Sequence, residues 1–476
     1  MGDTPWQGDA CSLVDEFRSG RRSPAEELQA TLDAIDASSL NAFCFIDREQ
    51  AEASARTADV SKPFGGVPIG VKELDSVLGW PDSHASVPLR HQVGGHTATQ
   101  VQRMRDDGGA VLVGQTTASE FGGVNVTRTV LHGTTHNPWQ HGRTPGGSSG
   151  GSAATVASGC VAVAHANDGG GSIRIPASEC GLVGLKPSKG RVSLGPALGE
   201  SWIGGVVEGC VSRSVRDTAA MMDVLSGYET GDPNTPPLPA RPYATEVGAK
   251  VEKLRVGLLS GALLPGGLDH PDARASVEAT GKLLQSLGHH VEVAHPAALN
   301  EAEFGDVFLA IVIAHIANDV AALEKAFGVT LTTDDIEPGN HLLAQFGNAT
   351  TAVAYLSAVS WVHAWTRRVV SWWLPRDGKQ GFDVLVTPTL AGPPPKIGAL
   401  SGDDSTDRIR EIMQYTAQFN MTGQPAISLP LHTSASGLPM GVQFVGAPYR
   451  EDLLIRLAAQ IEAAAPWSSR RPAVHA

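Results

Sequence analysis

Two stretches rich in glycine and serine carry the residue types best suited to chemistry in this chain. Residues 144–152 read TPGGSSGGS, and residues 167–177 read NDGGGSIRIPA. Glycine lets the backbone adopt positive φ and approach a ligand closely. In the second stretch three consecutive glycines precede Ser172, so several N–H groups can converge on one point, as a developing oxyanion requires. The two stretches therefore predict an active site that uses serine.

The same stretches are open to three other interpretations: flexible linkers, a nucleophile elbow or a phosphate loop. Linkers are often rich in glycine and serine, but each stretch leads directly into an ordered-looking segment, residues 152–157 and the apolar residues 180–185. Residues 146–150 match the G-x-S-x-G elbow, which needs a strand directly before it, whereas residues 137–145 are rich in turn formers. No G-x-x-x-x-G-K-[ST] phosphate loop occurs. The active-site interpretation is favoured.

A serine hydroxyl is a weak nucleophile and needs a base within hydrogen-bond reach. His141 and His165 are the histidines nearest to the serine turns in sequence, and Ser-Lys pairs are a known substitute for Ser-His pairs. Lys72 follows the buried-strand pattern of residues 67–71, at the end where open α/β sheets place their ligands. Taken alone, Lys72 is more typical of a solvated lysine at a strand end. To act as a base it must be buried, because burial lowers the pKa of lysine.

Several motifs of the chain together resemble the signature of one enzyme family. They are GGSSGGS around Ser148, DGGGSIRIP from Asp168, GLKP at residues 184–187, VPIGVK ending at Lys72, FNMTGQPA at residues 419–426 and GVQFVG at residues 441–446. On these residues the chain is identified as a member of the amidase signature family. The resemblance covers about residues 60–230 and 383–467.

The resemblance implies a hydrolase of amide bonds, and also of esters or carbamates, that forms an acyl-enzyme without a metal or organic cofactor. It implies that Ser172 is the nucleophile and that Lys72 and Ser148, the latter on a cis peptide bond, are the base system. Ser148 would relay the proton between Ser172 and Lys72 and then deliver it to the leaving nitrogen. The N–H groups expected to form the oxyanion hole are those of Gly169, Gly170, Gly171 and Ser172.

Further residues are expected to support this triad. Asp168 and Arg174 should pair and pin the glycine loop, with a surface ion pair of little energetic value as the alternative. Ser149 belongs to the same supporting group. Gly122 and Gly123 are expected to contact the substrate.

One position departs from part of the family. Amidotransferase subunits usually carry glutamine after the arginine, where this chain has Ile175, so a glutaminase that feeds ammonia to a partner is the less favoured alternative. A catalytically inactive scaffold is a third interpretation, and the presence of all three proposed catalytic side chains argues against it. The signature, together with residues 226–233, looks like the branch of the family that contains 6-aminohexanoate cyclic dimer hydrolase.

The composition of the chain limits the kinds of partner and the cellular location that are expected. The chain has 476 residues and a net charge of −13, so a small-molecule substrate is expected rather than nucleic acid or an anionic membrane surface. Five cysteines without C-x-x-C spacing, and no signal-peptide pattern in residues 1–9, indicate a cytoplasmic protein. No apolar run approaches the ~20 residues of a membrane span. A homodimer is compatible with these observations.

Helical and strand patterns alternate through most of the chain. They predict one large α/β/α domain over residues 1–476, with a mixed, twisted sheet covered by helices on both faces. Residues 298–375 should be largely helical, and the segment of about 298–380, which matches no family motif, should form much of the acyl pocket. Its four tryptophans are expected in a core or an interface rather than in a substrate wall. Strands are expected at residues 42–46, 67–71, 110–114, 161–165, 254–259, 290–293, 383–387, 426–430 and 441–445, and helices from residue 24 and at 97–107, 215–225, 271–287 and 451–463.

The sequence indicates no H-E-x-x-H motif and no Cys/His cluster, which predicts a reaction that needs no metal ion. Dialysis against EDTA should therefore leave the rate of amide hydrolysis unchanged, because serine, lysine and backbone N–H groups supply the chemistry. The rate before and after dialysis measures this. A loss of activity that added zinc restores would contradict the serine mechanism.

Overall fold

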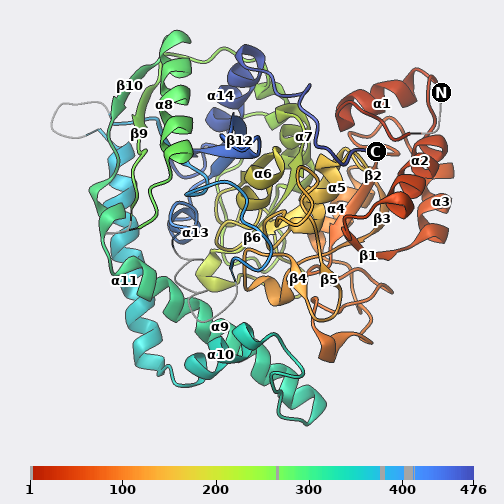
Figure 1. Cartoon of the computed structure of the whole chain (residues 1–476), viewed down its shortest axis with the longest axis horizontal. Helices are drawn as coiled ribbons and strands as arrows, with labels where there is room; N and C mark the ends of the chain where they lie inside the picture. The colour runs from red at the N-terminus through yellow and green to blue at the C-terminus, as the bar shows by residue number, and fades with distance from the viewer. Residues whose placement is uncertain (1–3, 264–266, 376–380, 401–410, 412) are drawn as a thin grey trace.

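A long mixed β-sheet runs through the middle of the protein (Figure 1). The computed structural model describes residues 4–263, 267–375, 381–400, 411 and 413–476. Within these residues, eleven strands pair in the order β1-β3-β2-β6-β8-β7-β12-β13-β11-β9-β10. Their bounds are β1 Phe43–Ile46, β2 Pro68–Lys72, β3 Val111–Thr116, β6 Val163–Asp168, β7 Val183–Lys186, β8 Val207–Ser212, β9 Arg255–Leu258, β10 His290–Val293, β11 Val384–Pro388, β12 Ala426–Thr433 and β13 Pro439–Gly446. A separate two-stranded ribbon pairs β4 Arg128–Thr129 with β5 Gly133–Thr134.

Helices cover both faces of this sheet. Their bounds are α1 Ala10–Arg18, α2 Pro24–Ala37, α3 Arg48–Arg56, α4 Thr99–Asp106, α5 Gly150–Ala157, α6 Arg174–Cys180, α7 Val215–Leu225, α8 Pro271–Ser286, α9 Phe304–Phe327, α10 Pro338–Asn348, α11 Ala352–Val370, α13 Ala417–Met421 and α14 Glu451–Ala464. One apolar core joins the sheet to α1, α4, α7, α8 and α14. The opposite face packs against α2 and α3, α5 and α6, and α11 and α13.

Alternation along single strands produces these two cores. Val384 and Val386 of β11 lie in the core with α8 and α14, whereas Leu385 between them lies in the core with α11 and α13. Successive side chains of a strand point to opposite faces, so a strand that is apolar at every position is covered on both sides. The predicted α/β/α architecture is confirmed.

Most of the expected elements are present, with ends shifted by a few residues. The helix expected from residue 24 is α2, which begins with a capping box between Ser23 and Glu26 and with Pro24 in its first turn. Residues 298–375 contain the three helices α9, α10 and α11, which Figure 1 shows along one side and the lower margin of the molecule. Trp365 and Trp373 are buried in the core there, and Trp361 and Trp372 pack against it. Sequence patterns predicted neither the strands β7 and β8 nor the helices α6 and α13, and they marked residues 152–157, within α5, only as an ordered segment.

Helix α9 corrects one expectation. Its 24 residues are long and apolar enough to cross a membrane, by length and composition only, whereas no run of that kind was expected. Some of its apolar side chains pack against α10 and α11, others line a cavity, and 28% of its most apolar 18-residue window is buried. Asp306 and Asp319 interrupt the run and obscured it in the sequence.

The contact between α9 and α10 depends on a glycine. A Cβ added at Gly347 of α10 would lie 2.0 Å from the carbonyl oxygen of Ile313, whereas one added at Gly339 of the same helix meets no atom within 4 Å. Gly347→Ala should therefore destabilise the protein by about 1–3 kcal/mol. Gly339→Ala should be neutral or slightly stabilising, because alanine favours a helix. Denaturation midpoints of the two variants test this, and equal midpoints would contradict it.

Candidate active site

The three segments that carry Lys72, Ser148 and Ser172 meet where the interior strands β2 and β6 of the sheet end. Lys72 is the last residue of β2, and Asp168, the last residue of β6, leads into the glycine turn before Ser172. Strands β2 and β6 are parallel neighbours, so their carboxyl ends lie side by side. Ser148 stands just before α5, and its peptide bond to Gly147 is cis, as the resemblance implied.

Lys72 is hydrogen-bonded to Ser148 in the interior of the protein. Its Nζ donates to Ser148 Oγ at 2.7 Å and to Asn167 Oδ1 at 2.6 Å. Lys72 is fully buried, Ser148 is 1% exposed and Ser172 is 9% exposed. Both serines line one cavity. A solvated lysine at a strand end, the more typical interpretation for the residue alone, does not describe Lys72.

Burial lowers the pKa of Lys72 to about 8, against the opposing charges of the carboxylates of Asp75, Glu208, Asp168 and Glu73. A pKa near 8 leaves a sizeable neutral fraction at neutral to mildly alkaline pH, whereas free lysine is almost wholly protonated there. The sequence predicted this desolvation. Glu73 follows Lys72 directly but binds elsewhere, because its carboxylate accepts the N–H of Ala118 at 2.7 Å.

A buried polar network that the sequence patterns did not predict lies behind Lys72. Asn167 Nδ2 donates to Asp75 Oδ2 at 3.1 Å, and His165 Nε2 lies 3.0 Å from Glu208 Oε2. His165 Nδ1 lies 3.8 Å from Asp75 Oδ2, which joins the two pairs. Burial and the charge of Asp75 raise the pKa of Glu208. Glu208 lies in β8, a strand that was not expected, so no local signal connected it to Lys72.

The glycine turn places its N–H groups unequally. The N–H of Gly171 donates to Asp168 Oδ1 at 2.7 Å, and the N–H of Ile173 donates to Asp168 Oδ2 at 3.1 Å. Within the described part of the chain, the N–H groups of Gly169, Gly170 and Ser172 make no hydrogen bond. Gly171 has φ 140°, which favours glycine. Because its N–H is occupied by Asp168, Gly171 shapes the turn and is not a free oxyanion donor, which corrects its expected role.

Asp168 and Arg174 form a fully buried, bidentate ion pair. Arg174 Nη2 lies 2.9 Å from Asp168 Oδ1, and Nε lies 2.9 Å from Oδ2. Although burial raises it, the charge and hydrogen bonds of Arg174 hold the pKa of Asp168 well below its usual range. The guanidinium also donates to Gln443 Oε1 and Asn420 Oδ1, each at 2.6 Å. The surface-pair alternative is therefore wrong, and the pair fixes the loop as predicted.

The remaining expected residues lie around the same site. Ser149 is buried, and its Oγ donates to the carbonyl oxygen of Asn167 at 3.3 Å, so it holds the strand that carries a partner of Lys72. Gly122 lines the cavity of the serines, and a Cβ there would lie 3.3 Å from Ser148 Oγ. Gly123 lines the adjoining cavity. A Cβ at Gly123 would lie 2.6 Å from Asn340 Oδ1, so the missing side chain makes room for Asn340.

Ser172 borders two cavities of different character. The apolar compartment, about 260 Å³, is lined by Phe304, Phe308, Leu309 and Val312 of α9, by Leu342 and Leu343 of α10, and by Val124. The acidic compartment, about 510 Å³, is lined by Asp75, Asp82, Glu208 and Asp319 with His84, His96 and Ser148. Gly122, Ser172 and Trp202 line both. Helices α9 and α10 thus form much of the pocket wall, as expected of residues 298–380.

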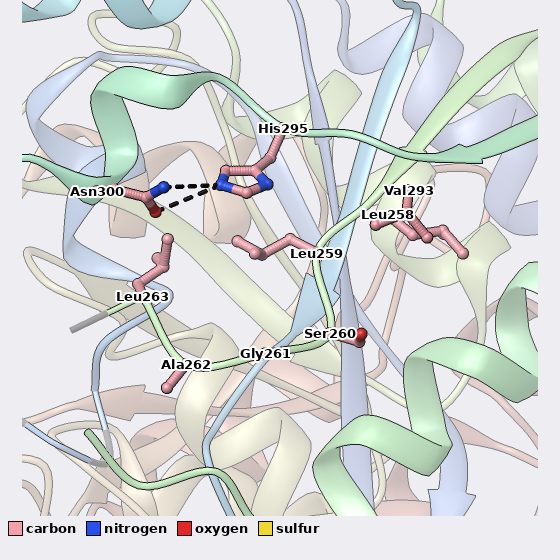
Figure 2. A pocket seen from close by; sticks show the side chains of 9 residues that line it. All are labelled: Leu258, Leu259, Ser260, Gly261, Ala262, Leu263, Val293, His295 and Asn300. Atoms are coloured by element: carbon pink, nitrogen blue, oxygen red, sulfur yellow. Dashed lines mark hydrogen bonds between the residues drawn. The ribbon is translucent and has the colours of Figure 1, made fainter. Parts of the chain in front are cut away.

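A third cavity, of about 410 Å³, lies at the ends of β9 and β10 (Figure 2). Of its three polar side chains, Ser260, His295 and Asn300, the last two face each other, with Asn300 Nδ2 and His295 Nε2 3.2 Å apart. None of its lining residues lines the two compartments at Ser172. It has no part in the chemistry of the serines.

Two groups in the described residues bring metal-ligand atoms within 4.8 Å of one another: Cys44 with Glu73 and His132, and Asp75 with His165 and Glu208. Sequence spacing did not reveal the Cys/His group, because its members are far apart in the chain. In each group a histidine already faces a carboxylate, with His132 Nε2 2.8 Å from Glu73 Oε2 and His165 Nε2 3.0 Å from Glu208 Oε2. The EDTA experiment tests both groups.

Known proteins share this fold and signature. A family model described as Amidase matches residues 26–455, and the chain belongs to the amidase family. It is an amide hydrolase of the amidase signature type.

Particular relatives are similar along nearly the whole chain. The 6-aminohexanoate-cyclic-dimer hydrolase of Paenarthrobacter ureafaciens is 38% identical, over 98% of this chain and 96% of the relative. A solved structure of 6-aminohexanoate cyclic dimer hydrolase has a TM-score of 0.92 and 37% identity, over 98% of this chain and 99% of that chain. A bacterial aryl acylamidase has a TM-score of 0.86 and 25% identity, over 97% of this chain and 96% of that chain. The resemblance to the branch that contains 6-aminohexanoate cyclic dimer hydrolase, which was predicted from the signature, is confirmed.

The pKa of Lys72 predicts how the rate of amide hydrolysis depends on pH. If neutral Lys72 accepts the proton, kcat for an amide should rise with pH to a plateau above about 8. Lys72→Met should lower kcat by about 10²–10⁴-fold, with a smaller effect on KM. Lys72→Arg should be nearly as harmful, because guanidinium stays charged and cannot accept a proton. A Lys72→Arg variant that keeps most of its activity on an amide would contradict the role of Lys72 as a base.

Removal of one nearby carboxylate, that of Asp75, tests whether the pKa of Lys72 sets the pH dependence of the rate. Asp75 stabilises the protonated form of Lys72, so its neutralisation in Asp75→Asn should lower the pKa of Lys72. The rising limb of the rate should then move to lower pH, whereas in Lys72→Met it should disappear. An unmoved limb in Asp75→Asn would show that another group sets the pH dependence.

Proposed function

We propose that the protein hydrolyses amide bonds with Ser172 as nucleophile, Ser148 as proton relay and Lys72 as base. The observation that carries this proposal is the hydrogen bond of 2.7 Å between a fully buried lysine and Ser148, on a cavity that Ser172 also lines. Ser172 Oγ attacks the carbonyl carbon while its proton passes to Ser148 Oγ, whose own proton passes to Lys72 Nζ. This relay gives the serine the base that it needs.

Hydrolysis then completes by the reverse route. The oxyanion of the tetrahedral intermediate accepts the N–H groups of Gly170 and Ser172, with Gly169 beside them. The proton on Lys72 returns through Ser148 to the leaving nitrogen, the C–N bond breaks, and the acyl group remains as an ester of Ser172. Water attacks this ester by the same proton route and releases the acid. Each oxyanion donor contributes about 10²–10³-fold to the rate in comparable sites.

The proposal covers linear and cyclic amides, and esters and carbamates as more reactive substrates of the same serine. The named relatives, a cyclic-dimer hydrolase and an aryl acylamidase, make a lactam and an anilide the first substrates to test. A core at about residues 60–230 and 383–467, with residues 298–380 as the variable part, belongs to the proposal. So do a cytoplasmic location, a possible homodimer, the absence of nucleic-acid and membrane partners and the lack of a cofactor.

Two alternatives receive less support. A glutaminase of the amidotransferase type would carry glutamine at the position of Ile175, which is buried and whose side chain lies close to Gly171. A glutamine there would place an amide against the catalytic turn. An inactive scaffold gives no reason to bury an ammonium group against a serine. Ammonia release from glutamine by the protein alone, compared with hydrolysis of an aryl amide, separates the glutaminase from the proposed activity.

Replacement of each serine tests the assigned roles. Ser172→Ala should lower kcat by roughly 10⁵–10⁶-fold and abolish the covalent acyl-enzyme, because the attacking oxygen is lost. Ser148→Ala should also impair amide hydrolysis, but activated esters should suffer less, since their leaving groups need no proton. Mass spectrometry of the acylated protein and steady-state rates on paired amides and esters measure these effects. Near-native activity in Ser172→Ala, with Ser148→Ala as the only dead variant, would assign the nucleophile to Ser148 instead.

A further inference from the structure

The position of Ser148 tells which cavity receives which half of the substrate. In the proposed reaction Ser148 protonates the leaving nitrogen, so the amine side must lie next to Ser148. Ser148 lines the acidic compartment and is not among the described residues that line the apolar compartment. The acidic compartment is therefore the amine side, and the apolar compartment, which also reaches Ser172 and Gly170, is the acyl side.

One helix face extends along both compartments. Phe304, Phe308 and Val312 of α9 line the acyl side, and Asp319 and Leu323 of the same helix line the amine side. Their spacings of four or seven residues keep them on one face of the helix. Trp202 lines both compartments. It packs edge-on against Phe308, with the two ring centroids 6.3 Å apart. The change from phenylalanine to aspartate along one helix thus coincides with the change from acyl side to amine side.

The carboxylates of the amine side fall into two pairs. Asp75 and Glu208 are buried and belong to the network of Lys72 and His165. Asp82 and Asp319 lie outside that network.

The second pair is only weakly compensated. Asp82 accepts the hydroxyl of Ser76 at 2.8 Å and lies 3.5 Å from His84 Nε2. Among the described residues Asp319 accepts one long hydrogen bond, from Asn318 at 3.5 Å, and His315 and His84 are the nearby groups that can stabilise its charge. Asp319 is exposed to solvent, whereas Asp82 is half-buried. No lysine or arginine occurs among the described residues that line this cavity. The compartment beside the leaving nitrogen therefore carries negative charge with little to balance it.

We propose that the preferred substrates are amides with an uncharged apolar acyl group whose leaving amine carries a second, cationic nitrogen: monoacylated diamines, with the ammonium bound by Asp319 and Asp82. This inference rests on the proposed function. Water adds across the C–N bond, the acyl carbon takes the hydroxyl and the nitrogen takes the proton, and the products are a carboxylic acid and a free diamine. Charge-assisted hydrogen bonds from the ammonium to the carboxylates supply the selectivity.

Three substrates of matched size test the inference. N-hexanoylcadaverine carries an ammonium on the amine side, N-hexanoylhexylamine replaces that ammonium by a methyl group, and δ-aminovaleryl hexylamide places the ammonium on the acyl side. We expect kcat/KM for N-hexanoylcadaverine to exceed that for N-hexanoylhexylamine by about 10-fold or more, the effect of one hydrogen bond between charged groups. We expect δ-aminovaleryl hexylamide to be the poorest of the three. Added salt should reduce the preference, because it screens charges that water reaches.

Variants of the two aspartates test whether they bind the ammonium of the substrate. Asp319→Asn should reduce the preference for N-hexanoylcadaverine over N-hexanoylhexylamine several-fold, and Asp82→Asn with Asp319→Asn should bring the ratio close to one. Asp334→Asn is the matched control, because Asp334 is exposed in the loop after α9 and lines neither compartment. It should keep the wild-type ratio. A ratio between two substrates of one variant does not depend on how much of that variant is folded.

The outcomes separate this inference from the proposed function. If the protein hydrolyses none of the three substrates and no simple anilide or lactam, the proposed function is overturned. Hydrolysis of all three at similar rates would leave that function standing and overturn the inference. A preference for δ-aminovaleryl hexylamide would show that the two sides are reversed. A preference for N-hexanoylcadaverine that persists in the double variant would overturn the assignment to Asp82 and Asp319.

Discussion

The carboxylate of Asp168 is the group on which the geometry of the catalytic turn depends. It accepts the N–H groups of Gly171 and Ile173 and the Nε and Nη2 groups of Arg174. Arg174 in turn binds Asn420 and Gln443. A buried carboxylate that loses its cation costs about 3–5 kcal/mol. The turn before Ser172 is therefore stable only when the C-terminal strands and α13 are packed against it, which explains why motifs from distant parts of the chain belong to one signature.

A second constraint acts on Lys72, where two opposing effects meet. Complete burial destabilises the ammonium, and the nearby carboxylates stabilise it, so that the pKa falls to about 8 instead of much further. Fewer carboxylates would leave a lysine that is too weak a base to take a proton from serine, and more solvent would leave one that is always protonated. The network through Asn167 and Asp75 thus sets the strength of the base while Asn167 also fixes its position.

The alternation of helix and strand patterns allowed the fold class to be predicted, and the family signature as a whole, rather than any single motif, pointed to Lys72, Ser148 and Ser172. A strand that ends in Lys72, and glycine runs that end in Ser148 and Ser172, can be recognised in a few residues each. The network of His165 and Glu208 could not be predicted, since it depends on the antiparallel pairing of β6 with β8, and β8 has no distinctive pattern. Gly171 was misassigned for a related reason. Sequence shows that an N–H is present, but only the three-dimensional turn shows that Asp168 already binds it.

The same distinction applies to specificity. The signature residues lie at the ends of β2 and β6 and on the elements that Asp168 and Arg174 hold together, whereas α9 and α10 line the compartments without contributing to that ion pair. A change at Phe308 alters the acyl side and a change at Asp319 alters the amine side, eleven residues apart on one helix. Neither change touches the turn that holds Ser172. Under the proposed function, α9 therefore determines which substrate is preferred, whereas the turn that the buried ion pair holds determines the chemistry.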